Sequence, residues 1–227
     1  MLINFIKNTG VIICIISGSI FLNKFDNQIN EQQVDANLPF AVMAQEVANE
    51  PVVEMVLGKN EAPISIVEYA AYTCIHCATF HKKIYPQLKS EFIDTDKVKF
   101  TYREFYFHRW GLWGSMIARC ANNDQKVFFG VTDQIYKKRD AWLNKKEDDQ
   151  AALSELKKIG KFFGLTDEKL ESCLADKEKL TRLVEWWQSN KQIDEINSTP
   201  TLIIDGEKFE VTSYEQLAVF LNKKLSE

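Results

Sequence analysis

The pattern of apolar and polar positions after residue 50 predicts a sheet that begins with a strand–helix–strand unit. Residues 51–57 and 64–70 are short apolar runs separated by a polar turn, and residues 98–106 form a third run of this kind. A helical pattern lies between the last two runs, from Cys74 to about Phe92, and Pro86 should kink that helix. Two strands joined through a helix predict a parallel crossover connection.

Helical periodicity then replaces the strand pattern from Trp110 to about Ile196. Amphipathic helices are predicted at residues 115–121, 124–138 and 153–163, and after the capping residues Thr166 and Asp176. The apolar stripes of such helices usually face a core, so a binding surface on these stripes is the weaker alternative.

The strand pattern resumes at residue 201. Residues 201–204 and 208–211 predict a hairpin around Asp205-Gly206-Glu207, and residues 213–225 predict a final helix. Each half of the sheet is incomplete alone. We therefore predict one α/β domain over residues 51–227, with a core formed by residues 51–108 and 198–227 and a helical insertion at residues 109–197.

Cys74 and Cys77 form a Cys-x-x-Cys motif where the central strand gives way to the helix. The first turn of a helix leaves backbone N–H groups unpaired and carries the positive end of the helix dipole. We therefore expect the pKa of Cys74 to be lowered and its thiolate to be the attacking sulfur. Cys77 is close enough in sequence to form an exchangeable disulfide with Cys74. His76, in its cationic form, should favour the thiolate further, and Glu68 in the strand could accept a proton from Cys77.

A structural zinc site is the alternative interpretation of Cys74 and Cys77, because His76 and His81 lie near them in the sequence. A closed zinc site needs four ligands, usually from two knuckles, and the chain has no second Cys-x-x-Cys and no His-x-x-x-His. A Cys-x-x-Cys beside a strand–helix–strand pattern is typical of redox proteins, so we favour redox chemistry and predict no metal.

The segment from Val67 to His81 (VEYAAYTCIHCATFH) resembles the active-site segment of the DsbA-like thiol:disulfide oxidoreductases of the thioredoxin superfamily. The resemblance extends from about Pro51 to the C-terminus, through weaker matches in the helical block and a specific one at Thr199-Pro200. It implies a thioredoxin fold with a helical insertion between the third strand and a strand that begins at a cis-Pro. One departure is Ile75, where members of this group commonly have Pro; this bears on the redox potential and leaves the exchange chemistry in place.

Pro200 has two interpretations. From the sequence alone it is an ordinary trans proline at a strand edge, because cis bonds are a small minority of X-Pro bonds. The resemblance implies a cis bond between Thr199 and Pro200. That bond would point the backbone of Thr199 at the cysteine pair, where Thr199 and Pro200 could bind an extended substrate.

The N-terminal residues predict export. Residues 1–22 contain one lysine followed by an uncharged apolar run at 11–22, which has the length of a signal-peptide core. The cleavage site is poor, so an uncleaved N-terminal anchor stays open as an alternative. Residues 23–50 are polar and predict a linker or tail. Both alternatives place the domain outside the cytosol, in the periplasm.

Export also bears on Cys120 and Cys173, which lie in the helical block. Two buried free thiols are one alternative for this pair. An exported protein experiences an oxidising compartment, so we favour a structural disulfide between them.

These observations predict a protein-disulfide oxidoreductase that oxidises other exported proteins through Cys74 and Cys77. Its partners would be exported proteins with cysteine thiols and a membrane redox protein that reoxidises it. No cofactor is implied, because the disulfide itself is the redox centre. A net charge of −4 without a basic cluster gives no indication of nucleic-acid binding. A disulfide isomerase or reductase of the same fold, and a redox-inactive or zinc-loaded binding or chaperone module, are the alternative functions.

Overall fold

The computed structural model describes residues 51–122, 124–144 and 148–227, which lie in the compact unit Glu46–Glu227. The predicted leader or anchor at residues 1–22 and the predicted linker at residues 23–50 lie outside the described residues. Within the part that is described, no helix is long and apolar enough to cross a membrane.

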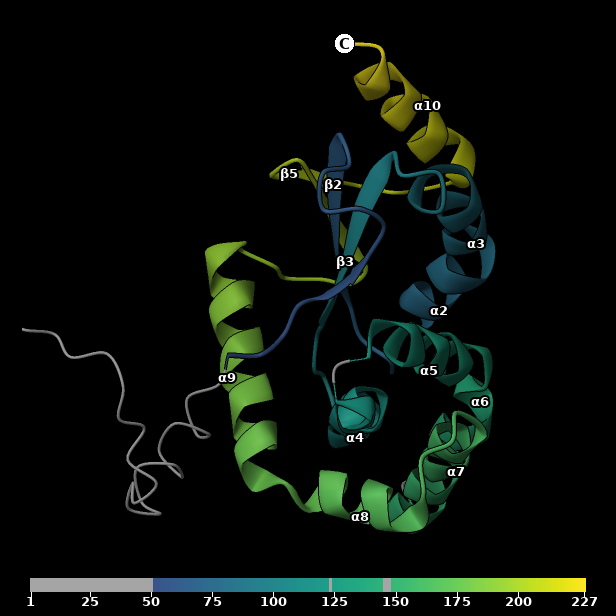
Figure 1. Cartoon of the computed structure of the whole chain (residues 1–227), viewed down its shortest axis with the longest axis vertical. Coiled ribbons are helices and arrows are strands. Elements are labelled where there is room, and N and C mark those ends of the chain that lie inside the picture. The colour runs from purple at the N-terminus through teal and green to yellow at the C-terminus, as the bar shows by residue number, and fades with distance from the viewer. Residues whose placement is uncertain (1–50, 123, 145–147) are drawn as a thin grey trace, which may run out of the picture. The chain divides into compact units, whose positions relative to one another are not determined.

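The described strands form one sheet in the order β1-β3-β2-β4-β5 (Figure 1). The central strand β2 (Ile64–Ala70) runs parallel to β3 (Val98–Glu104), which confirms the predicted crossover. The other neighbouring pairs are antiparallel: β1 with β3, β2 with β4, and β4 with β5. Side chains alternate between the two faces of a strand, so Glu68 lies on the same face of β2 as Ile66 and Ala70.

The first strand is shorter than predicted. We expected residues 51–57, whereas β1 comprises only Met55–Leu57. The backbone just before it is bound by side chains instead of a neighbouring strand. The carbonyl oxygen of Val53 accepts a hydrogen bond from Arg119, at 2.8 Å, and that of Glu54 accepts one from Gln125, at 3.1 Å. These contacts come from residues far away in the sequence, which an apolar pattern does not reveal.

The helix predicted from Cys74 to Phe92 is broken into three pieces. They are α2 (Ile75–Lys83), α3 (Tyr85–Leu88) and the π-helical turn η1 (Lys89–Ile93). Pro86 lies in the first turn of α3, where its missing N–H group is not needed. The predicted kink is therefore a break at Ile84.

The block between β3 and β4 is helical, as predicted. Its elements are α4 (Arg109–Ala118), the 3-10 turn η2 (Arg119–Ala121), α5 (Gln125–Lys137), α6 (Arg139–Leu143), α7 (Asp149–Phe162), α8 (Asp167–Ala175) and α9 (Lys177–Ile193). Thr166 and Asp176 cap their helices, since each side chain accepts a hydrogen bond from a backbone N–H three residues on. Helix α4 begins six residues before the predicted start at 115, and α6 was not predicted.

The C-terminal elements follow the prediction closely. Strands β4 (Thr201–Ile204) and β5 (Glu207–Phe209) form a hairpin, and helix α10 (Tyr214–Leu225) follows the cap Ser213. Asp205 and Gly206 both have positive φ, at 50° and 87°. Two such residues are what a tight two-residue hairpin turn requires, and this explains the Asp-Gly pair.

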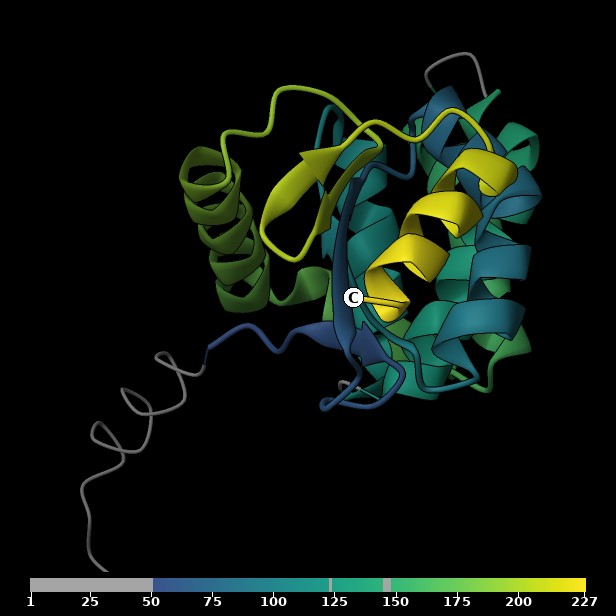
Figure 2. The same cartoon turned by 90° about the horizontal axis from the view of Figure 1, so that it is seen from above.

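Helices cover both faces of the sheet (Figures 1 and 2). The larger core lies on the face that carries α2, α3 and α10, and it extends into the helical block. A smaller apolar cluster, which includes Tyr69, Phe105 and Ile203, lies on the other face against Trp187 of α9. Glu68 therefore faces the larger core, on the side where α2 packs.

Cys120 and Cys173 are joined in a disulfide in this structure, with their Cα atoms 5.8 Å apart. The bond links η2 to α8 within the helical block and closes a loop across 53 sequence positions. Both side chains are buried.

We expect this disulfide to stabilise the fold without taking part in exchange. A variant with Cys14, Cys74 and Cys77 changed to Ser keeps only Cys120 and Cys173, and after denaturation it should show no titratable thiol. Reduction should then cost about 2 to 4 kcal/mol in the free energy of unfolding, because the closed loop restricts the unfolded chain. Two thiols on denaturation of the unreduced variant would contradict this pairing in the isolated protein.

Candidate redox site

Cys74 lies at the junction between the central strand and the first helix. After β2 ends, the chain makes one turn in which the N–H of Cys74 donates to the carbonyl oxygen of Ala71, at 3.0 Å. Cys74 then takes the N-cap position of α2, with extended backbone angles (φ −78°, ψ 126°), and its carbonyl oxygen accepts the N–H of Ala78. No side-chain oxygen caps this helix, so a sulfur atom occupies the place where an N-cap oxygen usually lies.

The surroundings of Cys74 stabilise its thiolate. Its pKa is lowered to about 5, mainly because the Cys77 thiol donates a hydrogen bond to it; Thr199 and the backbone N–H groups of Cys77 and His76 lower the pKa further. Partial burial opposes these contributions. The lowered pKa agrees with the helix-terminus argument made from the sequence. The backbone of His76 contributes to it, while the His76 side chain is exposed.

Cys77 has the opposite character. Its side chain is fully buried, and burial raises the pKa of its thiol far above the usual range, with further contributions from Cys74 and from the charge of Glu68. At neutral pH, Cys74 is therefore a half-buried thiolate and Cys77 a buried thiol. This asymmetry is what an attacking and a resolving cysteine require.

Thr199 and Pro200 lie directly against the cysteine pair. The peptide bond between them is cis, and the carbonyl oxygen of Thr199 lies 3.3 Å from the Cys74 sulfur, where it accepts a hydrogen bond only from the protonated thiol. The Thr199 hydroxyl is buried beside the cysteines, and its interaction with Cys74 is part of what lowers the pKa of that thiol. The two residues immediately precede β4, which pairs with β2, so the sheet holds this segment beside the start of α2.

Glu68 has a partner that we did not assign from the sequence. Its carboxylate is fully buried, and Oε2 lies 3.1 Å from Nε2 of His81. His81 was considered only as a zinc ligand and as part of the DsbA-like motif. A signal was present, because His81 follows Cys77 by four residues and so lies on the same face of α2. The structure thus brings together Cys74, Cys77, Glu68, Thr199 and Pro200, and adds His81.

The arrangement of these side chains does not form a closed metal site. Among the described residues, no three or more His, Cys, Asp or Glu side chains come together in a way that could hold a metal ion. The nitrogen of His81 that faces β2 is engaged by Glu68. The zinc alternative therefore lacks a complete ligand set in this part of the chain.

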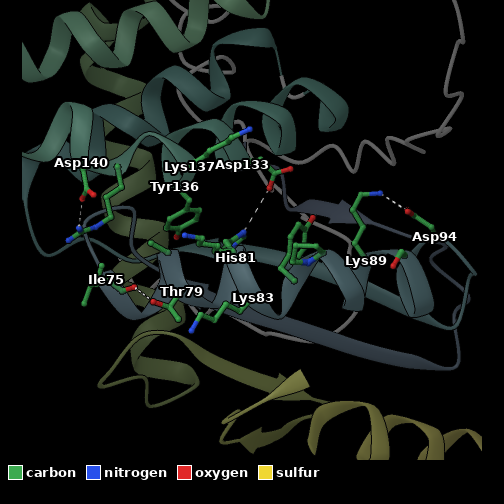
Figure 3. Close-up of a pocket in the computed structure, with 16 residues that line it drawn as sticks. Ile75, Thr79, His81, Lys83, Lys89, Asp94, Asp133, Tyr136, Lys137 and Asp140 are labelled. Atoms are coloured by element: carbon green, nitrogen blue, oxygen red, sulfur yellow. Dashed lines mark hydrogen bonds and ion pairs between the residues drawn. The ribbon is translucent and has the colours of Figure 1, made fainter. Parts of the chain in front are cut away.

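A groove of about 970 Å³ lies beside the site, between the helices α2 and α3 and the helices α5 and α6 (Figure 3). The exposed side chain of Ile75, between the two cysteines, lines one end of it. His81 and Tyr136 line its wall, and Asp133 and Asp140 are among its charged residues.

Comparison with known proteins agrees with this fold. The thioredoxin family model matches residues 50–223. A Rickettsia bellii protein, whose name assigns it as a candidate protein-disulfide oxidoreductase, is 31% identical over 174 residues, which are 77% of this chain and 65% of that protein. Disulfide bond formation protein D of Bacillus subtilis is 27% identical over 180 residues, which are 75% of this chain and 76% of that protein.

A solved structure shows the same fold. The crystal structure of Wolbachia pipientis alpha-DsbA1 superposes with a TM-score of 0.71 at 23% identity, covering 80% of this chain and 95% of that one. The fold and the cysteine pair at the start of α2 define a DsbA-like protein of the thioredoxin superfamily. The chain belongs to the thioredoxin family, because the family model matches most of its length. It spans less than two thirds of the Rickettsia relative.

Proposed function

We propose that this protein is a protein-disulfide oxidoreductase that works by thiol–disulfide exchange through Cys74 and Cys77. The observation that carries the proposal is the pairing of a Cys74 thiolate, with its pKa lowered to about 5, and a buried Cys77 thiol at the start of one helix. The names of the Rickettsia and Bacillus relatives support the same class of reaction.

In the oxidising direction the protein starts with a Cys74–Cys77 disulfide. A substrate thiolate attacks the sulfur of Cys74, the bond to Cys77 breaks, and the Cys77 thiolate takes a proton from Glu68. A second substrate thiolate then attacks the substrate sulfur of the mixed disulfide, and Cys74 leaves as a thiolate. A low pKa makes Cys74 a good leaving group in that last step. Thr199 and Pro200 would bind the substrate backbone while the mixed disulfide exists.

We infer that oxidation, more than isomerisation or reduction, is the activity. A thiolate with a strongly lowered pKa stabilises the reduced protein, so the disulfide gives up its oxidising equivalents readily. A reductase needs the opposite balance. The test is the reduction potential of Cys74–Cys77 against glutathione. A reduction potential of about −120 mV, the level of a strong disulfide oxidase, would support oxidation. A potential of about −270 mV, the level of thioredoxin, would support a reductase instead.

The pH dependence of stability tests the same inference. The pKa of Cys74 is about 5 in the folded reduced protein, below the value of about 8.5 for a free cysteine. A lowered folded-state pKa contributes stability that is present above the unfolded pKa and is lost as pH falls through the folded value. The reduced form should therefore be more stable than the oxidised form at pH 7.5, and this difference should shrink steadily toward pH 5. Urea unfolding of both forms at several pH values would measure it, and a pH-independent difference would contradict the assignment.

We propose that the protein acts outside the cytosol, in the periplasm, on exported proteins that carry cysteine thiols. The apolar run at residues 11–22 supports export, either as a signal peptide or as a retained anchor, and the Cys120–Cys173 disulfide fits an oxidising compartment. A membrane redox protein would then reoxidise Cys74 and Cys77. Fractionation of cells that express the chain, followed by trapping of the thiol state of Cys74, tests both points.

A further inference from the structure

The exchange reaction requires the buried thiol of Cys77 to lose a proton and to regain it. Its side chain is fully buried, and its pKa is raised far above the usual range by burial. Each catalytic cycle nevertheless requires Cys77 to become a thiolate and to be protonated again. Bulk water does not reach the sulfur directly, so the proton must pass through neighbouring polar groups.

A line of such groups leads away from Cys77 into the groove beside α2. The charge of Glu68 acts on Cys77, and Glu68 Oε2 lies 3.1 Å from Nε2 of the buried His81. The other ring nitrogen, Nδ1, lies 3.9 Å from Oδ1 of Asp133 on α5. Both residues line the groove, and Figure 3 marks the contact between them with a dashed line. The Asp133 side chain is 49% exposed, so a small rotation could bring its carboxylate within hydrogen-bond distance while it keeps contact with water.

Two buried atoms on this line lack partners. Glu68 Oε1 and His81 Nδ1 make no hydrogen bond within the described residues. Buried polar atoms are usually satisfied, so each unpaired one calls for an explanation. A relay gives one, because an atom that passes a proton on must be able to change its partner.

The other groups around His81 do not compete for the proton. The ring of His81 stacks on Tyr136 of α5, at 4.2 Å between centroids, and also contacts Tyr85 of α3 and Tyr102 of β3. Burial raises the pKa of all three phenols above the usual range, so they stay neutral. Lys89, the nearby cation of η1, acts on Asp133, and its ammonium group donates to Asp94. Glu68 and Asp133 are therefore the carboxylates that face the two ring nitrogens.

We propose that Glu68, His81 and Asp133 form a proton relay between Cys77 and the groove. The proposal rests on the exchange function proposed above and extends it to two residues, His81 and Asp133, that touch neither sulfur. We call these three the relay residues. The raised pKa of Asp133, which partial burial causes, brings that carboxyl closer to neutral pH and suits it to accept and release protons.

The relay can be followed in a reaction in which a disulfide such as oxidised glutathione oxidises the reduced protein. The Cys74 thiolate attacks one glutathione sulfur, forms a mixed disulfide and releases one glutathione thiolate. Cys77 then gives its proton to Glu68 and attacks the sulfur of Cys74, which forms the Cys74–Cys77 bond and releases the second glutathione thiolate. The dithiol loses two electrons and glutathione gains them. In the tautomer with its hydrogen on Nδ1, His81 accepts the proton of Glu68 at Nε2 and releases the Nδ1 proton to Asp133, which gives it to water. The same transfers run in reverse when the protein oxidises a substrate, and this restores the starting tautomer.

Replacing Asp133 by Asn separates a relay from a simple charge effect. Removing a negative charge near Cys77 and Glu68 favours the Cys77 thiolate. On electrostatic grounds alone, the second step, in which Cys77 attacks the mixed disulfide at Cys74, should therefore be unchanged or faster. A relay predicts the reverse. An amide accepts no proton, so the second step should slow by about tenfold at neutral pH, a modest part of what acid–base catalysis usually contributes.

The experiment mixes reduced full-length protein with oxidised glutathione, quenches with acid, and follows the mixed disulfide at Cys74 and the Cys74–Cys77 disulfide by peptide mass spectrometry. We expect Asp133→Asn to accumulate the mixed disulfide, while the alkylation rate of Cys74 and its pH midpoint stay as in the unchanged protein. Added imidazole buffer should restore the second step, because a small base in the groove can take the proton from His81. Asp140→Asn is the matched control, since Asp140 lines the same groove and is 81% exposed beside Arg139.

A second variant guards against an indirect effect at Asp133. His81→Gln keeps a side-chain N–H that can donate to Glu68 but has no second ring nitrogen to pass the proton on, so it should slow the same step at least as much. The proposal is overturned if both Asp133→Asn and His81→Gln form the Cys74–Cys77 disulfide as fast as Asp140→Asn. If the unchanged protein itself fails to form that disulfide, the exchange function is what fails.

Discussion

Replacing Cys77 by Ser should stop the proposed exchange at the mixed disulfide, so that the variant traps its reaction partner. The Cys74 thiolate remains at the start of α2, where its backbone N–H contacts are unchanged, so it still attacks a disulfide and forms an adduct. No second thiol is then held beside the mixed bond. Loss of an intramolecular nucleophile should lengthen the life of the adduct by about a hundredfold or more. Intact-mass analysis after mixing with oxidised glutathione would show an adduct that persists in the variant and disappears in the unchanged protein.

Cys74→Ser is the matched control for the trap. The parent protein and both variants also carry Cys14→Ser, so the thiol that remains in Cys74→Ser is Cys77. Cys77 is fully buried and its pKa is raised, so it should form no adduct under the same conditions. Comparable adducts in both variants would contradict the division of roles between the two cysteines. Rapid loss of the adduct from Cys77→Ser would do so as well.

The redox pair could be placed from the sequence because its determinants are local. The apolar run at residues 64–70 predicts the central strand, and the helical pattern that begins at Cys74 places this residue at a helix N-terminus. The lowered pKa follows mainly from Cys77 itself and from backbone groups within three residues of Cys74; the contribution of Thr199, which is distant in the sequence, is the part that needed the fold. The Asp-Gly turn of the hairpin and the caps of α8 and α9 are local in the same sense.

The elements that were missed depend on distant contacts. Helix α4 begins at Arg109, but Gly111 and Gly114 weaken its helical pattern. Gly114 is needed because a Cβ there would lie 2.9 Å from the ring of Tyr72, which belongs to another part of the chain. The early end of the first strand has the same origin, since Arg119 and Gln125 bind the backbone at Val53 and Glu54.

The residues of the proposed proton relay could not all be identified from the sequence. Glu68 was singled out from its place in an apolar strand, but Asp133 is 52 positions beyond His81 and belongs to a different helix. Its pattern in the sequence is that of an exposed helical residue. What makes it a candidate is the position of α5 against α2, which local periodicity does not encode.

The buried ion pair between Arg119 and Glu104 is the clearest feature that the sequence pattern did not predict. Charged side chains are rarely fully buried, so neither residue gave a signal from its sequence position. In the structure both side chains are 1% exposed, and the guanidinium donates to the two carboxylate oxygens at 2.5 and 2.8 Å. The same guanidinium lies near the rings of Phe128 and Trp186. The pair thus connects the end of β3 to η2 and, through Trp186, to α9.

Glu104→Gln should therefore destabilise the protein strongly. The amide keeps the shape of the carboxylate but leaves the charge of Arg119 buried without its counterion, which costs about 3 to 5 kcal/mol in the free energy of unfolding. For a chain of this size the Tm should fall by about 10 to 15 °C. The same acid-to-amide change at Asp96, whose ion pair with Lys59 is exposed to solvent, should cost far less.

A double variant, Glu104→Leu with Arg119→Met, distinguishes the cost of breaking the pair from the value of having it. Apolar side chains of similar size remove both charges together, so most of the stability lost in Glu104→Gln should return. Urea unfolding of the three proteins would measure these differences. If Glu104→Gln lost no more stability than Asp96→Asn, the pair would not be desolvated in solution. If the double variant were as unstable as Glu104→Gln, the charges themselves would be required to hold β3 against η2.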